Sequence, residues 1–130
     1  MKLLIYLIVL LPILAISQRD IKFGSIPVMA ASYNTYTTKD GQIISFKNSI
    51  NIGIPSGADG FRFITRDWVG ADNIIAGRKL PIKRIRSFQR QLLRNKIFLE
   101  IRPYGISPIF VDYEMALESG EIIADPKEIN

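Results

Sequence analysis

Residues 80–102 read LPIKRIRSFQRQLLRNKIFLEIR, and the way in which they fold decides the architecture of the chain. One interpretation is a helix over residues 81–95. Pro81 suits the first position of such a helix, because its missing N–H would have no partner there in any case. Apolar residues also recur at helical spacing, at Ile82, Ile85, Phe88 and Leu92.

The same residues can instead form a hairpin. Residues 80–88 would be a bulged strand that turns around residues 90–95 and continues into a second strand at 96–102. Every other residue from Ile97 to Ile101 is apolar, as expected of a half-buried strand. We favour the hairpin and keep the helix over residues 81–95 as the alternative.

The stretch before this segment contains further strand and turn signals. Residues 33–46 read YNTYTTKDGQIISF, and the Lys39-Asp40-Gly41 turn between two β-rich runs predicts a hairpin. Residues 49–54 and 61–65 alternate in polarity and predict two more strands. Two glycines, Gly70 and Gly77, lie in residues 67–79, which we expect to form a long loop with Trp68 tucked against the core.

The stretch after it predicts a short strand followed by a helix. Residues 108–111 are suited to a strand. Asp112 then stands where an N-cap would, Glu114 lies in the first turn and Gly120 follows the end of the expected helix over 113–119.

These elements predict a mainly β fold, a small barrel or sandwich of five to six short strands with a short C-terminal helix. A helix at 81–95 would make the fold α+β instead. We expect one β-rich domain over residues 18–122 and a flexible tail over 123–130.

The first residues predict export. Lys2 precedes an apolar run of 14 residues, Leu3–Ile16, and Ala15 and Ser17 have the small side chains of a cleavage site. We therefore assign residues 1–17 to a signal peptide, with an uncleaved anchor as the alternative. The expected location is the periplasm, the outer envelope or the medium.

The composition excludes several kinds of chemistry. The chain has no His and no Cys, which removes Ser-His-Asp triads, Cys-His pairs, ordinary zinc sites and disulfides. Asp59, Asp67 and Asp72 do not have the spacing of a calcium loop, so we interpret them as loop-capping residues. We predict no catalytic residue, no metal and no cofactor.

A carboxylate-based hydrolase is the least favoured alternative. Four acids lie close together in the sequence, and Asp112 and Glu114 would be its reacting pair. The first-turn acids of a helix have a simpler explanation, since they interact favourably with the helix dipole.

The distribution of charge indicates one candidate contact surface. Nine basic residues against one acid lie between Arg78 and Arg102, whereas residues 112–128 hold six acids against one lysine. The candidate binding residues are Lys83, Arg84, Arg86, Arg90, Arg94 and Lys96. Forked guanidinium groups suit phosphate and carboxylate partners. The alternative is a solvated basic face that the acidic end of the chain partly neutralises.

Several of these features occur together in one protein group. The order of the Lys39-Asp40-Gly41 hairpin, Gly53 and Pro55, Ile82 and Ile85, and the closing run Asp112…Ala116-Leu117-Glu118-Ser119-Gly120-Glu121-Ile122 resembles a group of small exported, uncharacterised proteins of Bacteroidota. The resemblance covers most of residues 33–122. It implies export and a β-rich fold, and no activity or catalytic residue.

The sequence thus favours a non-enzymatic interaction module of the cell envelope. Its expected partner is an acidic protein, an anionic glycan or a lipid headgroup rather than nucleic acid. The alternative is a structural or assembly subunit that docks through strand edges.

Overall fold

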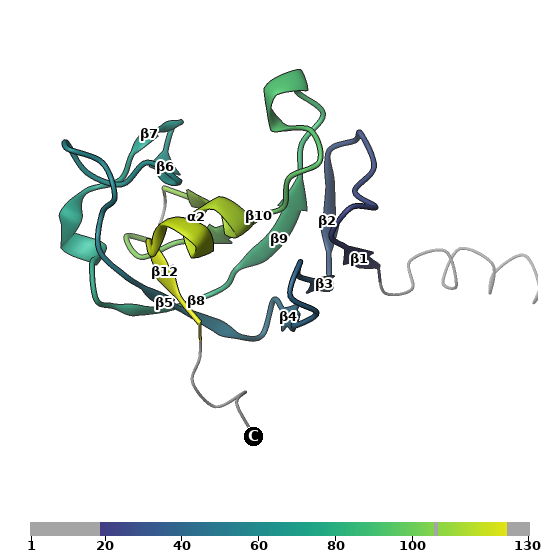
Figure 1. Ribbon diagram of the computed structural model, residues 1–130, viewed down its shortest axis with the longest axis horizontal. Coiled ribbons are helices and arrows are strands. Elements are labelled where there is room, and N and C mark those ends of the chain that lie inside the picture. Colours follow the sequence, from purple (N-terminus) through teal and green to yellow (C-terminus); the bar gives the residue numbers. More distant parts are fainter. Residues whose placement is uncertain (1–18, 106, 125–130) are drawn as a thin grey trace, which may run out of the picture.

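The computed structural model describes residues 19–105 and 107–124. The predicted signal peptide, residues 1–17, lies outside the described residues. Within them, twelve strands form three sheets, and the one α-helix is α2 (Tyr113–Ser119) (Figure 1). No helix in this part of the chain is long and apolar enough to cross a bilayer.

The largest sheet has six strands and carries most of the basic segment. Its strands are, in spatial order, β2 (Ala31–Tyr33), β9 (Arg84–Ser87), β10 (Phe98–Ile101), β11 (Ile109–Asp112), β6 (Ile64–Arg66) and β7 (Val69–Gly70). Every neighbouring pair in it is antiparallel. The fold therefore places residues that are far apart in the sequence on neighbouring strands.

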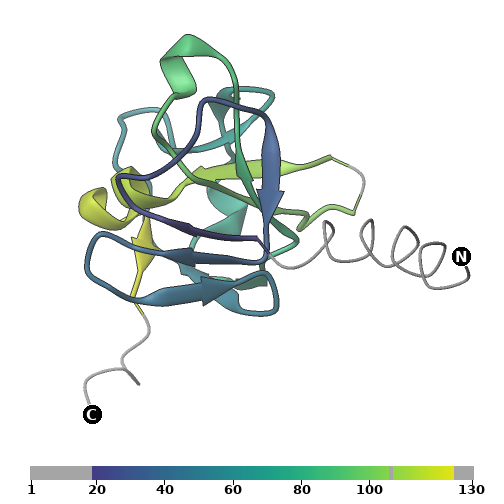
Figure 2. The same cartoon turned by 90° about the vertical axis from the view of Figure 1, so that its right-hand side faces the viewer.

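Two three-stranded sheets complete the sandwich-like fold. One contains β1 (Asp20–Lys22), β3 (Thr35–Thr37) and β4 (Ile43–Ser45), and the other contains β12 (Ile122–Ile123), β5 (Ser49–Ile52) and β8 (Lys79–Pro81). Two 3-10 turns are η1 (Asn73–Ile75) and η2 (Gln91–Leu93). In Figure 2, α2 lies at one side of the body beside β12, and the loop with η2 projects beyond the sheets.

The core is apolar on the inner face of the six-stranded sheet. Because strand side chains alternate between faces, Leu99 and Ile101 of β10 are buried in the core cluster with Ile85 of the neighbouring strand β9. Phe98 and Glu100 point to the opposite face, yet both are buried. Side chains from the neighbouring strands and loops cover that outer face, and the candidate site is built there.

The mainly β fold with a short C-terminal helix is confirmed in its sandwich-like form, but the described residues form twelve short strands in place of the expected five to six. The segment that decided the architecture forms strands and not a helix over 81–95: β9 and β10 pair antiparallel, with Leu99 opposite Ile85. The predicted bulged strand over 80–88 is divided between two sheets, because β8 pairs with β5 while β9 pairs with β10.

Two of the predicted local structures agree closely with the sequence. In the first hairpin, Tyr36 of β3 pairs with Ile44 of β4, and Gly41 in the turn has a φ of 86°. The helix begins at Tyr113 and ends before Gly120, whose φ of 80° is the left-handed C-terminal conformation. Ile123 was assigned to the flexible tail, but it belongs to β12 and pairs with Asn51 of β5. Residues 125–130 of the predicted tail lie outside the described part.

The interpretation of residues 67–79 as a loop with Trp68 against the core was wrong in part. Asp67 and Trp68 form a tight turn between β6 and β7, with φ values of 52° and 63°. Turns with two left-handed residues match the twist of a hairpin, but glycine and asparagine are their usual residues. Trp68 is 41% exposed and contacts the outer face of the large sheet.

Candidate functional site

The structure separates the six candidate basic residues into three pairs. Lys83 and Arg84 are exposed at the beginning of β9. Arg90 and Arg94 are exposed at the two ends of η2. The remaining two, Arg86 and Lys96, are in ion pairs with buried carboxylates. The fold therefore does not gather the six residues into one continuous patch.

Arg86 is part of a charged and aromatic cluster on the outer face. Its Nη1 lies 3.5 Å from Oε1 of Glu100, a side chain that is 1% exposed, and Nε of Arg102 lies 3.1 Å from the other carboxylate oxygen. The guanidinium of Arg86 also lies over the rings of Phe88 and Phe110, at 5.1 and 5.9 Å. Two cations thus neutralise the buried Glu100 carboxylate, and Arg86 is held within the fold.

Lys96 has a comparable position at the other end of β10. Its Nζ lies 2.7 Å from Oδ2 of Asp112, and the Asp112 carboxylate is buried. Burial raises the pKa of Asp112, although the Lys96 ammonium opposes that shift. Lys96 is therefore held in place beside the beginning of α2.

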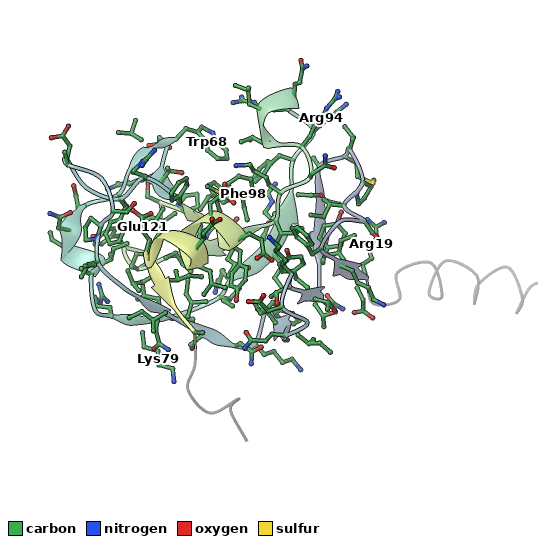
Figure 3. The ribbon with its side chains drawn as sticks, viewed as in Figure 1. Arg19, Trp68, Lys79, Arg94, Phe98 and Glu121 are labelled. Atoms are coloured by element: carbon green, nitrogen blue, oxygen red, sulfur yellow. The ribbon has the colours of Figure 1, made fainter. Side chains whose placement is uncertain are left out.

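Four aromatic rings connect two loops at one end of the molecule. Trp68 stacks on Phe110 with ring centroids 5.4 Å apart and an interplanar angle of 11°. It also meets Phe88 and Phe98 edge to face, at 5.4 and 5.7 Å. Phe88 and Phe98 lie at the two ends of the β9–β10 loop, so this cluster fixes the β6–β7 turn against the base of that loop (Figure 3).

A third loop reaches the same end. Ala31 of β2 pairs with Ser87 of β9, and the Ser87 hydroxyl donates to the carbonyl oxygen of Met29 at 2.8 Å. The residues just before β2 therefore lie beside the residues just after β9. Both Val28 and Met29 are exposed.

The three loops together present a surface that we call the tip surface. It consists of the exposed side chains of Val28, Met29, Trp68, Val69, Arg90, Leu92 and Arg94. Leu92 is 90% exposed and Val69 69% exposed, which are high values for large apolar side chains. Asp67, in the same turn as Trp68, is an exposed acid at its edge.

The helix acids that a hydrolase would use are bound within the fold. Glu114 accepts a hydrogen bond from the Tyr36 hydroxyl at 2.6 Å and one from the Lys39 backbone N–H at 3.0 Å. Burial, together with the bond to Glu114, raises the pKa of Tyr36 well above its usual range. Asp112 pairs with Lys96, as described above, so both acids already have partners in the fold.

Glu121 is fully buried and organises the loop between β5 and β6. Its Oε2 accepts from the backbone N–H and hydroxyl of Ser56 and from the N–H of Arg62, and its Oε1 accepts from the N–H of Phe63, all at 2.7–2.9 Å. Burial by itself would raise the pKa of Glu121, but these hydrogen bonds outweigh it and the pKa is lowered. Figure 3 shows Glu121 in the interior beside α2.

A cavity of about 350 Å³ lies between two edge strands, away from the tip surface. Residues of β4 and β12 line it, among them Ile43 and Ile123, together with Lys47 and Lys79. Neither Asp112 nor Glu114 is among its lining residues. In residues 19–105 and 107–124, no group of three or more acids is placed to hold a metal ion.

Comparisons with protein-family models, with curated proteins and with solved structures found no match for this chain. The resemblance to exported proteins of Bacteroidota therefore stays a prediction. Any functional conclusion has to come from the arrangement of the residues themselves.

Sequence reasoning found the arginines of the tip surface but missed its apolar half. Val28 and Met29 belong to a mostly apolar run that indicates a strand as readily as a loop. Trp68 and Val69 follow Asp67 in a turn without the usual turn residues. The available signal was Leu92, since in a hairpin the run Arg90–Asn95 must be a turn that contains two leucines.

Proposed function

We propose that this chain is an exported, non-enzymatic binding module of the cell envelope that holds an anionic partner through the β9–β10 loop. The observation that carries the proposal is the exposure of Arg90 and Arg94 at the two ends of η2. Within the described residues neither arginine is in an ion pair. Two unpaired guanidinium groups on one projecting turn suit phosphate, sulfate or carboxylate groups.

The distribution of the acids supports this proposal. Glu100, Asp112 and Glu121 are buried, and Glu114 is bound by Tyr36. These four carboxylates have partners elsewhere in the fold, so none of them neutralises Arg90 or Arg94. A positive surface attracts anionic partners over distances of about one Debye length, roughly 8 Å at physiological salt.

Retention on heparin, a sulfated polysaccharide, tests the proposal. We expect the chain to bind at low salt and to elute as salt screens the contacts. Arg90→Glu combined with Arg94→Glu should remove most of the retention. Arg78→Glu combined with Lys79→Glu is the matched control, because it changes the net charge equally at the opposite end of the molecule (Figure 3).

Two results would contradict the proposal. One is equal loss of retention in both double variants, which would mean that net charge and not the loop governs binding. The other is absence of salt-sensitive retention in the unchanged protein.

A second candidate function is a structural subunit that docks through strand edges. The observation in its favour is the cavity between the edge strands β4 and β12, beside which Ile43 is 68% exposed. An added strand could pair with the open edge of β4. This candidate predicts oligomers that persist at high salt and that Ile43→Lys abolishes, as measured by light scattering.

A further inference from the structure

The apolar side chains of the tip surface indicate which class of anionic partner the loop contacts. We infer that the partner is a lipid bilayer containing anionic phospholipid, into whose interface the three loops insert. This inference rests on the proposed function, since the same two arginines would contact the headgroups. It adds a second contribution to binding, the burial of apolar side chains among acyl chains.

The first argument is the pattern at η2. Leu92 is 90% exposed and stands between Arg90 and Arg94, which cap the turn on either side. Such a turn can place an apolar side chain below the headgroups while the arginines stay at the level of the phosphates. A partner recognised by charge alone would leave the leucine in water.

The second argument is that the neighbouring loops repeat this pattern. Val69 and Trp68 are exposed on the β6–β7 turn, and Val28 and Met29 on the loop before β2. Trp is favoured at the boundary between headgroups and acyl chains, where its ring is amphipathic. Figure 1 shows the β6–β7 turn and the η2 loop at the same, upper end of the molecule.

The third argument is that the loops are held together before any partner binds. Trp68 contacts Phe88 and Phe98 at the base of the η2 loop, and Ser87 bonds to the Met29 carbonyl. The apolar residues are thus presented as one surface with little ordering required on binding. The cavity between β4 and β12 is lined by no residue of the tip surface, and the tip surface itself projects, as suits contact with a fluid bilayer.

The chain contains its own reporter for this contact, because Trp68 is its only tryptophan. The full chain is mixed with vesicles of phosphatidylcholine, with or without phosphatidylglycerol, at 0.15 M salt. Binding is measured by flotation, and Trp68 emission is followed with acyl chains that carry bromine as a quencher. Residues 1–17 are common to all variants and hold no tryptophan, so the emission reports the tip surface.

We expect Trp68 emission to shift to shorter wavelength and to be quenched only when phosphatidylglycerol is present. Leu92→Gln should weaken vesicle binding about tenfold, since an apolar side chain no longer enters the acyl region. Ile54→Gln is the control, an exposed isoleucine in the loop after β5 and outside the tip surface, which should leave binding unchanged. Both substituted side chains are exposed, so neither variant endangers the fold.

The outcomes separate this inference from the proposed function. If heparin retention depends on Arg90 and Arg94 but Trp68 shows neither shift nor quenching, the bilayer is the wrong partner and a glycan or an acidic protein replaces it. If Leu92→Gln and Ile54→Gln bind vesicles equally well, insertion by the tip surface is overturned. If neither heparin nor vesicles bind, both proposals fail.

Discussion

The loop held by Glu121 and the tip surface use charge in opposite ways. Around Glu121 a single carboxylate is removed from water and every donor that faces it is satisfied. At the tip surface, cations and large apolar side chains are exposed together, and within the described residues neither Arg90 nor Arg94 forms an ion pair. The comparison shows a fold that buries one carboxylate for stability and leaves two arginines of the β9–β10 loop available for contact.

The largest expected effect on stability comes from removing the buried Glu121 carboxylate. Glu121→Gln replaces one accepting oxygen by a donor group, so backbone N–H groups of the loop lose their acceptor. We expect a loss of about 3 kcal/mol in the free energy of unfolding, because buried donors are left unsatisfied. Urea unfolding measures it. Glu118→Gln, on the exposed side of the preceding helix α2, should change stability by less than about 0.5 kcal/mol.

Acid should produce the same loss without a mutation. The pKa of Glu121 is lowered in the folded state, so its stabilising contribution is present above its unfolded pKa of about 4.3 and is lost as the pH falls through the folded value. Asp112 has the opposite sign, since its raised pKa makes the folded state bind a proton first. The stability difference between wild type and Glu121→Gln should therefore shrink between pH 7 and pH 3. A difference that stays constant with pH would contradict this assignment.

A smaller effect is expected where an acid is only partly buried. Tyr36→Phe removes the hydroxyl that donates to Glu114, while the Lys39 N–H remains. We expect a loss of about 1 kcal/mol in thermal or urea unfolding, the usual net value of one hydrogen bond. Tyr104→Phe removes a hydroxyl from an exposed ring and should have almost no effect. Equal effects in the two variants would show that the Glu114 contact contributes nothing.

Substitutions in the tip surface should have the smallest effect on stability. Arg90→Glu combined with Arg94→Glu should change the free energy of unfolding by less than about 0.5 kcal/mol, because both side chains are exposed and outside the described ion pairs. Arg86→Glu should be far more damaging, since it would face the buried Glu100 carboxylate at 3.5 Å. Similar losses in both would mean that the loop arginines belong to the fold.

The sequence predicted elements whose signals are local. The Lys39-Asp40-Gly41 turn and the helix between Asp112 and Gly120 depend on residues within a few positions of one another, and the structure has both. Residues 80–88 were divided between two sheets because β8 and β9 have different partners, β5 and β10. Local alternation cannot specify which strand pairs with which.

The candidate site was predictable only in its charges. The positions of charged residues can be read directly from a sequence. Whether apolar residues such as Trp68 and Leu92 are exposed or belong to the core depends on the fold. Glu121 was grouped with the other acids near α2, and nothing local marks the donors of residues 56–63 as its partners. These contacts join residues about 60 positions apart, and they form only when the whole fold does.

That separation sets the order in which the chain can complete its structure. Synthesis proceeds from the N-terminus, so the loop at residues 56–63 emerges long before Glu121 can accept its N–H groups. β5 likewise cannot pair with β12, nor Tyr36 donate to Glu114, before these later residues are synthesised. The Glu121 loop, the β5–β12 pairing and the bond of Tyr36 are therefore completed only after residues 114–122 have been synthesised.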